Sequence, residues 1–242
     1  MTYTTPEQWR HIKVARSGGV TELTLHTDDG PLVWNGRAHQ EVADLWAWLA
    51  ADEATRVVIL TGTGDAFCDQ ITSPSSEREW HDIWLEGRRM IADLVNIDVP
   101  LISVVNGPAT IHTELALLAN IVLAVPGALF ADHAHVTRGV VPGDGVQVVW
   151  RNLVGPSRAS YHLLTGIPIA AEEALRLGMV HEIHEPGEVM ARAHALAEPL
   201  AALPREMLAY TCAALRIEDR RHLPEAVAHG LGFTGLAVHI GR

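Results

Sequence analysis

Histidines and carboxylates that could transfer protons gather in one stretch of the sequence, where Asp132-His133-Ala134-His135 is followed by Pro142-Gly143-Asp144-Gly145. A carboxylate on one imidazole nitrogen fixes the tautomer and stabilises the cation that forms when the other nitrogen takes a proton. His135 with Asp144 could therefore form a general base. Alternatively, Pro-Gly-Asp-Gly is only a turn in which Asp144 caps the next helix. His133 and His135 could also ligate a metal, but no third ligand stands at a recognisable spacing, so we expect no metal site.

His112 is a second candidate, because it follows the break Asn106-Gly107-Pro108 and is expected at a helix start. The first backbone N–H groups of a helix are unpaired and carry the positive end of its dipole, which suits the stabilisation of an oxyanion. The alternative is a surface histidine near a helix terminus.

Two further motifs give weaker signals. Gly62-Thr63-Gly64 follows an apolar run, but Phe67 stands where a dinucleotide fingerprint needs its third glycine, so we predict a turn. Ser73, Ser75 and Ser76 lack a G-x-S-x-G elbow and are predicted to be loop.

The elements that must position these residues alternate between strands and helices. Apolar patterning predicts strands at 21–25, 57–60, 101–105 and 121–125, and a hairpin-like stretch that runs on to Phe130. Helical spacing is found at 39–51, at 80–95 and over a short stretch near 112–119, and residues 191–240 contain no clear strand. The order predicts an α/β fold with a core over residues 1–190 and a C-terminal helical subdomain over 191–242.

Composition excludes several classes of protein. The chain has 242 residues, 48% of them hydrophobic, and a net charge of −11 with Lys13 as its single lysine, so it offers no basic surface for nucleic acid. The 17-residue uncharged run Leu115–Ala131 is too short for a membrane span, and Met1–Arg10 lacks the apolar stretch of a signal peptide. Cys68 and Cys212 are too few for a disulfide framework. We expect a cytoplasmic protein that binds neither nucleic acid nor membrane.

Three motifs together resemble the crotonase (enoyl-CoA hydratase/isomerase) superfamily over nearly the whole chain. They are the run 57–62 with Ala66-Phe67-Cys68, the run 104–109, and Gly139-Val140-Val141-Pro142-Gly143. The resemblance implies a repeated ββα core that assembles as trimers or dimers of trimers, with the C-terminal helices as the oligomerisation region. It also implies an oxyanion hole of two backbone N–H groups, which by position are those of Ile71 and Ile111.

The sequence also departs from that pattern. The family's glycine before the first donor is Gln70, and its Gly-Gly-Gly tract is Thr110-Ile111-His112. The acid after this tract persists as Glu114, whereas the second acid of hydratases is replaced by His135. Asp144 stands in the usual Pro-Gly-Ala-Gly segment. A lone carboxylate is thus exchanged for a His–Asp pair.

This set is similar to the carbon–carbon-bond hydrolases of the superfamily, the 6-oxocamphor hydrolase and β-diketone hydrolase group. By matching position, His112, His135 and Asp144 correspond to active-site residues of that group, His39 to a further site histidine, and Trp34 to a tryptophan that lines its pocket. The C-terminal active-site glutamate of the group has no counterpart, because the tail near Leu236 lacks an acid. Glu114, Trp84 and Leu85 are further expected contacts of the substrate, although large apolar residues are by default core.

Charge also bears on the substrate. A CoA thioester carries phosphates that proteins normally bind with Lys and Arg, and this chain offers chiefly Arg37 and Arg220-Arg221 for that purpose. We therefore favour a free substrate over a CoA thioester.

These residues lead to the hypothesis of a cofactor-independent retro-Claisen hydrolase acting on a cyclic or bicyclic 1,3-diketone. His135, paired with Asp144, would activate water, and donors at Ile71, Ile111 or His112 would hold the oxyanion. Asp144 should raise the pKa of His135, so activity should fall on the acid side of neutrality. The alternatives are a CoA-dependent hydratase or isomerase that uses Glu114, and a non-catalytic oligomer of the same fold.

Overall fold

The structure is a computed structural model that describes residues 4–72 and 78–240. Within these residues the main sheet has six strands in the order β1-β2-β4-β6-β7-β10, with β1 antiparallel to β2 and the other neighbours parallel. The strands are β1 Ile12–Ser17, β2 Val20–Leu25, β4 Val57–Gly62, β6 Leu101–Val105, β7 Ile121–Ala124 and β10 Glu182–Ile183. Every residue of β4 and of β6 is buried, as expected for central parallel strands.

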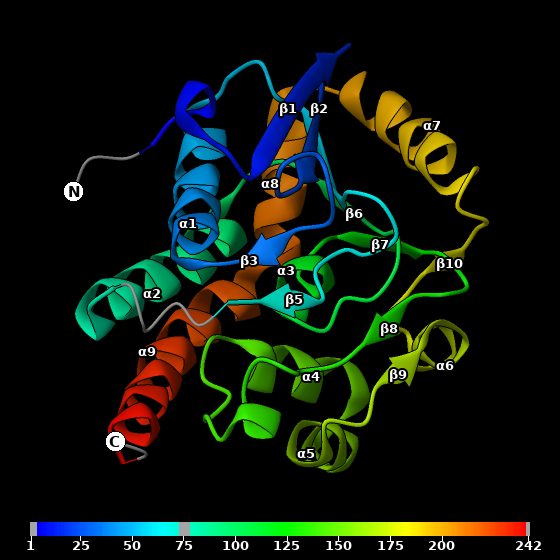
Figure 1. Cartoon of the computed structure of the whole chain (residues 1–242). Coiled ribbons are helices and arrows are strands. Elements are labelled where there is room, and N and C mark those ends of the chain that lie inside the picture. Colours follow the sequence, from blue (N-terminus) through cyan, green and yellow to red (C-terminus); the bar gives the residue numbers. More distant parts are fainter. Residues whose placement is uncertain (1–3, 73–77, 241–242) are drawn as a thin grey trace.

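Short strands form a second layer beside this sheet (Figure 1). Its members are β3 Val33–Trp34 with β5 Gln70–Ile71, and β8 Leu129–Phe130 with β9 Ile169–Ala170. Single bridges join Cys68 to Ala109 and Ala109 to Phe130 between these pairs. The hairpin predicted up to Phe130 is therefore wrong, because β8 pairs with β9 and not with β7.

The predicted ββα repeat is confirmed by the order of the elements. In each unit a long strand of the main sheet leads into an extended segment of the second layer and then into a helix. The units are β2–β3–α1, β4–β5–α2, β6–Ala109–α3, and β7–β8 followed by the 3-10 helix η3 and α4. Their helices are α1 Gly36–Ala51, α2 Trp80–Asn96, α3 Thr113–Leu117, η3 Val136–Arg138 and α4 Val146–Val154.

The motif around Asn106 binds two units together. Its side-chain oxygen accepts from the Gly62 N–H at 3.1 Å, and its amide donates to the carbonyls of Gly64 and Ala66. A Cβ on Gly107 would lie 1.8 Å from the Asp65 carbonyl oxygen, so glycine is required there. These contacts fix the turn between β4 and β5 against the end of β6.

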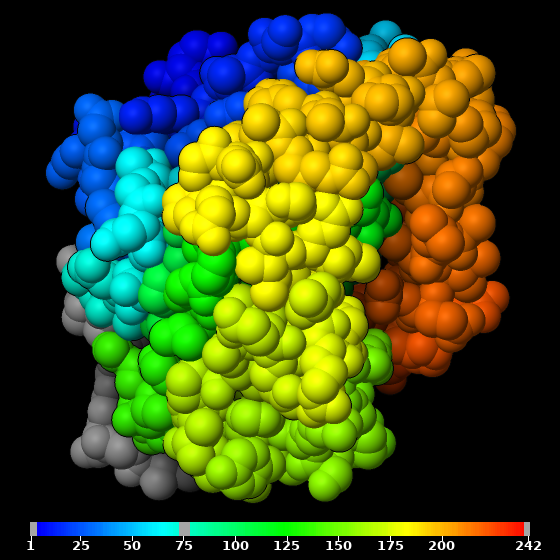
Figure 2. Space-filling model, turned by 90° about the vertical axis from the view of Figure 1, so that its right-hand side faces the viewer, coloured from blue at the N-terminus to red at the C-terminus, as the bar shows by residue number. Residues whose placement is uncertain are grey.

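The remaining helices complete the core and one pocket wall. They are α5 Pro156–Thr165, α6 Ala171–Leu177, α7 Val189–Ala201, α8 Arg205–Leu215 and α9 Ile217–Ile240. The chain from α6 to α7 is the yellow segment that crosses the face seen in Figure 2. Helix α7 packs on β2, β4, β6 and β7, so the boundary expected at residue 190 lies within a helix of the core, and the helical extension that packs on α2 is α9.

Two further expectations from the sequence concern membrane spans and the serine-containing loop. No helix among the described residues has both the length and the apolar character needed to cross a membrane. The predicted loop at Ser73, Ser75 and Ser76 lies outside the described residues.

Candidate active site

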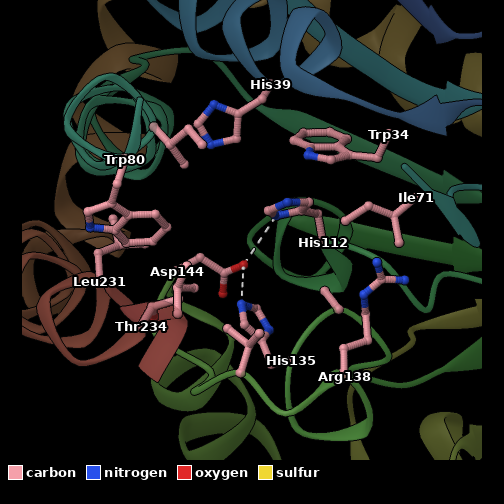
Figure 3. A pocket seen from close by; sticks show the side chains of 14 residues that line it. Trp34, His39, Ile71, Trp80, His112, His135, Arg138, Asp144, Leu231 and Thr234 are labelled. Atoms are coloured by element: carbon pink, nitrogen blue, oxygen red, sulfur yellow. Dashed lines mark ion pairs between the residues drawn. The ribbon is translucent and has the colours of Figure 1, made fainter. Parts of the chain in front are cut away.

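One pocket collects most of the predicted site residues (Figure 3). The residues that line it come from corresponding places in the four units, where the second-layer segment leads into the helix, and from α2 and α9. They are Trp34, His39, Ile71, Trp80, Ile83, His112, Ala134, His135, Arg138, Val140, Asp144, Leu231, Thr234 and Val238.

Asp144 lies between two histidines. Its Oδ2 is 3.4 Å from His135 Nε2 and 3.3 Å from His112 Nδ1, and both contacts are drawn in Figure 3. Burial opposes ionisation of Asp144, but the charge of His135, the nearby His112 ring and backbone hydrogen bonds outweigh it and hold the pKa of this carboxyl below its usual value. The predicted His135–Asp144 pair is thus present in the geometry, and His112 shares it.

His135 has a second carboxylate, which the sequence analysis did not assign to it. Its Nδ1 lies 2.8 Å from Asp132 Oδ1, at i,i+3 spacing. Burial by itself would lower the pKa of His135, but Asp144 and the hydrogen bond to Asp132 raise it to about 9. The imidazole is therefore charged at neutral pH. The Asp-x-x-His spacing is the sequence signal that could have indicated this contact. His133 contacts the Gly166 carbonyl instead.

His112 stands just before α3 in a left-handed backbone conformation, with φ 50° and ψ 44°. Such a conformation is uncommon without glycine and costs about 1 kcal/mol or more. Its ring lies over Trp34 with centroids 4.0 Å apart, and its Nδ1 is 2.7 Å from Glu114 Oε1. Burial, ahead of the opposing charge of Asp144, lowers the pKa of His112, so this ring is neutral where His135 is charged.

Glu114 is buried in contact with His112 and is not among the residues that line the pocket. Burial and the neighbouring Asp144 raise the pKa of Glu114 well above its usual value. Donor atoms of His112, Glu114 and Asp144 lie within 4.8 Å of one another, a spacing that can hold a metal ion. The 2.7 Å contact between His112 and Glu114 is a hydrogen bond, so a shared proton already explains why these two of the three side chains lie close together.

Trp34 contributes a donor without a partner. Its side chain is fully buried, and no described residue accepts from its Nε1–H. A buried N–H left unpaired costs free energy that a ligand oxygen would recover. Trp34 is also a residue that lines the pocket, so its indole is a candidate donor to a bound molecule.

The two predicted oxyanion donors differ. The Ile71 side chain lines the pocket, and the role of its N–H as a donor stays a prediction. The prediction for Ile111 is wrong, because its N–H donates to the Cys68 carbonyl at 3.0 Å and the Thr110 N–H donates to the same oxygen. The left-handed turn follows at His112, whose backbone N–H makes no hydrogen bond within the described chain.

Trp84 and Leu85 do not line the pocket. Trp84 lies under the Arg88 guanidinium, 4.4 Å from the ring centroid, and stacks with His81 on the same helix. Trp80, one turn earlier, is the tryptophan of α2 that reaches the pocket. The expectation that Trp84 and Leu85 contact substrate is therefore corrected.

Helix α9 supplies a wall that the sequence analysis missed, through Leu231, Thr234 and Val238. Its backbone meets the loop of Asp144 directly, since a Cβ on Gly143 would lie 2.3 Å from the Gly230 carbonyl. The Thr234 hydroxyl donates to the Val141 carbonyl at 2.9 Å. Small residues on both sides thus let α9 hold the Asp144 loop in place.

Comparison with known proteins agrees with this architecture. The family model of enoyl-CoA hydratase/isomerase matches residues 16–233. The chain belongs to this family. It is 29% identical over 205 residues to a probable peroxisomal enoyl-CoA hydratase 1 of Arabidopsis thaliana, which covers 83% of this chain and 76% of the relative. It is 28% identical over 194 residues to the carnitinyl-CoA dehydratase of Escherichia coli K12, with 78% and 74% covered.

Among solved structures of the family, a β-diketone hydrolase from the cyanobacterium Anabaena sp. PCC 7120, bound to (S)-3-oxocyclohexyl acetic acid, is similar at a TM-score of 0.94. Its sequence is 35% identical, and the match covers 98% of this chain and 97% of that one. An enoyl-CoA hydratase/isomerase from Mycobacterium paratuberculosis has a TM-score of 0.84 at 26% identity, with 94% and 93% covered.

In this enoyl-CoA hydratase/isomerase family member, the arginines that could meet CoA phosphates have other partners. Arg37 contacts Glu41 at 2.7 Å and the Gln8 carbonyl, and Arg220 binds Asp98 and the Val95 carbonyl. Arg221 lies 3.3 Å from Glu218 on the exposed side of α9. Because these arginines already have partners, they do not form a preorganised binding site for the phosphates of CoA.

Proposed function

We propose that this protein hydrolyses a carbon–carbon bond of a cyclic or bicyclic 1,3-diketone and releases a keto acid. The observation that carries the proposal is Asp144 between His112 and His135 at the wall of one pocket. The similar β-diketone hydrolase supports it, because the molecule bound there carries both a ketone and a carboxylic acid.

The proposed reaction begins with water. With Asp132 holding the proton on Nδ1, Nε2 of neutral His135 takes one proton from the water, and the oxygen bonds to one carbonyl carbon to give a tetrahedral oxyanion. Collapse breaks the bond to the carbon between the carbonyls, whose electron pair passes into the enolate of the second carbonyl. The proton on His135 then goes to that carbon, which completes the addition of water across the bond. A general base of this kind contributes about 10²–10⁴ in rate.

Two donors suit the oxygens of the substrate. The His112 backbone N–H has no partner in the described structure and stands at the start of α3. The Trp34 indole N–H is an unpaired donor on a residue that lines the pocket. A preorganised donor to a developing oxyanion is worth about 10²–10³ in rate. We assign the oxyanion to the His112 N–H and the second carbonyl to Trp34.

The pKa of His135 sets the pH dependence of this reaction. Because that pKa is about 9, only a small fraction of His135 is neutral at pH 7. The rate constant kcat/KM should therefore rise with pH through neutrality and level off above about pH 9. This rise lies further to the alkaline side than an ordinary histidine would place it.

The CoA-dependent alternative is favoured by the names of the sequence relatives. It requires Glu114 to reach the substrate. Glu114 is instead buried against His112, outside the pocket lining, and its raised pKa favours the protonated form. We therefore place this activity second.

The test is a spectrophotometric assay with a panel of 1,3-diketones, with crotonyl-CoA as a parallel substrate. Loss of enol absorbance that His135→Ala abolishes, with kcat/KM rising toward pH 9, is the expected result. Turnover of crotonyl-CoA without diketone cleavage would overturn the proposal. Diketone cleavage that survives in His135→Ala would remove His135 as the base.

We also propose a homotrimer or a dimer of trimers. Apolar side chains on α8 and α9, among them Tyr210, Leu215, Phe233 and Leu236, are exposed in the isolated chain, which supports burial against other copies. Light scattering after size exclusion should give a multiple of three chains, and a monomer at micromolar concentration would contradict the assembly.

A further inference from the structure

His39 enters the pocket from the start of α1, across from His135 (Figure 3). Its Nδ1 lies 3.0 Å from Oε2 of Glu86, which projects from the neighbouring helix α2. Arg78 donates two hydrogen bonds of 2.7 Å to the same carboxylate, one to each oxygen. The side chains of His39 and Glu86 are 7% and 8% exposed, so water competes little for these bonds.

This chain of contacts determines where the proton of His39 lies. Burial works against the charge of Glu86, but the hydrogen bonds from His39 and Arg78 outweigh it and keep the pKa of Glu86 low. An ionised carboxylate can only accept hydrogen bonds, so Nδ1 of His39 must carry the proton. Burial lowers the pKa of His39 against the opposing effect of Glu86, while His112 and Arg78 lower it further. The ring is therefore neutral, with a lone pair on Nε2.

The Nε2 edge of the ring is open. No residue that the structure describes hydrogen-bonds to this atom. Gly87 of α2 lies beside this edge, since an added Cβ there would lie 3.7 Å from Nε2 and 3.0 Å from Leu231, a residue of the pocket wall. The missing side chain at Gly87 leaves the lone pair accessible from the pocket.

We propose that Glu86, held by Arg78, is a positioning residue that fixes His39 as a hydrogen-bond acceptor for the attacking water. The inference rests on the proposed function and adds a second contact to the nucleophile. Water has two protons: His135 removes one, and Nε2 of His39 accepts a hydrogen bond from the other. A water whose two protons are engaged in this way keeps its lone pairs for the carbonyl carbon. Such positioning changes the rate of the chemical step more than the binding of the diketone.

The first test is Glu86→Gln, which keeps the shape of the side chain but places an amide N–H where a carboxylate oxygen was. The tautomer of His39 is then no longer imposed. We expect kcat on the best 1,3-diketone to fall about 10- to 100-fold while KM changes less than about threefold. The pH midpoint set by His135 should stay in place.

Asp44→Asn is the matched control. Asp44 on α1 binds Arg89 on α2 at 2.5 Å, so it joins the same two helices through a buried carboxylate, but it does not line the pocket. Its kcat should stay within about threefold of the wild type. Thermal unfolding of both variants separates loss of helix packing from loss of positioning. Equal effects of the two substitutions on kcat, or a shifted pH midpoint in Glu86→Gln, would overturn the positioning role.

The second test does not depend on activity. Long-range proton–nitrogen NMR of the full chain, with His39 assigned from the His39→Gln spectrum, should show protonated Nδ1 and bare Nε2 at pH 7. A protonated Nε2 or a charged ring would overturn the inference. If the wild type cleaves no diketone, the proposed function fails and the water assignment with it. If it cleaves diketones that Glu86→Gln cleaves equally well, only the positioning role fails.

Discussion

The two sides of the pocket that carry His135 and His39 shift the pKa of these histidines in opposite directions. His135 meets Asp132 on one nitrogen and Asp144 on the other, and within the described residues no arginine pairs with either carboxylate. His39 meets one carboxylate, Glu86, and that one is shared with Arg78. The pKa is raised to about 9 for His135 and lowered for His39. For these two buried histidines the direction of the pKa shift follows the number of carboxylates that no arginine shares, because burial alone lowers the pKa in both cases.

The sharpest way to break this comparison is Asp144→Asn, which leaves His135 with one carboxylate as His39 has. We expect kcat/KM for the diketone to fall about 10²- to 10⁴-fold. The pKa of His135 should also fall, because the charge of Asp144 helps to raise it, so the midpoint of the pH–rate profile should move to lower pH. Steady-state kinetics from pH 6 to 10 measures both. A wild-type midpoint in Asp144→Asn would contradict the assigned pair.

The pH dependence of stability tests the same difference without a substrate. The pKa of His135 is raised from 6.5 to about 9 on folding, so its contribution is fully present below about pH 6.5 and is lost as pH rises through 9. The free energy of unfolding should fall by about 3 kcal/mol over this range on account of this group. Urea unfolding at several pH values measures it, and His135→Asn should lack this part of the slope. An equal slope in His135→Asn would refute the raised pKa.

The ring of Trp34 contacts both His39 and His112. Trp34→Phe keeps much of the ring and removes the unpaired N–H, so we expect about a tenfold loss in kcat/KM. Trp46→Phe is the control, because Trp46 is also fully buried with an unpaired Nε1 but lies outside the pocket. An equal loss of activity in the two variants would assign the effect to packing.

The smallest effect is expected for Glu114→Gln. Glu114 is buried with a raised pKa, so an amide resembles the form that the carboxyl already favours. Diketone cleavage should stay within about threefold of the wild type in the standard assay. A loss of 100-fold or more, or the appearance of crotonyl-CoA turnover in the wild type that this substitution abolishes, would favour the CoA-dependent alternative.

The sequence predicted the parts of the fold that rest on local pattern. The continuous apolar strands β4 and β6 and the helices α1 and α2 lie close to their expected ranges, because burial on both faces of a strand or one face of a helix shows in residue order. Two-residue strands such as β3 and β5 show no periodicity. Strand β1 was missed because most of its residues are exposed or half-buried.

In the site, too, contacts that rest on local motifs were predicted and contacts that rest on tertiary packing were not. His112, His135 and Asp144 lie together as their motifs predicted. The contact of His39 with Glu86 spans 47 positions and exists only because α1 packs on α2, so no local spacing could indicate it. Ile111 failed as a donor because the left-handed turn at His112 shifts which N–H is free, and a backbone angle cannot be read from residue types.

The pocket lining separates the ionisable residues from the residues of α9, so substrate preference could change without a change in the proton-transfer groups. The ionisable groups all come from residues before 145, whereas α9 contributes Leu231, Thr234 and Val238. Of these, Leu231 and Val238 form no hydrogen bond to the proton-transfer groups, so their volume can change while the acid–base arrangement is retained. Mutational libraries restricted to these two positions would explore ring size and stereochemical preference of the substrate. The glycine contact at Gly143 and Gly230 marks where such variation must stop.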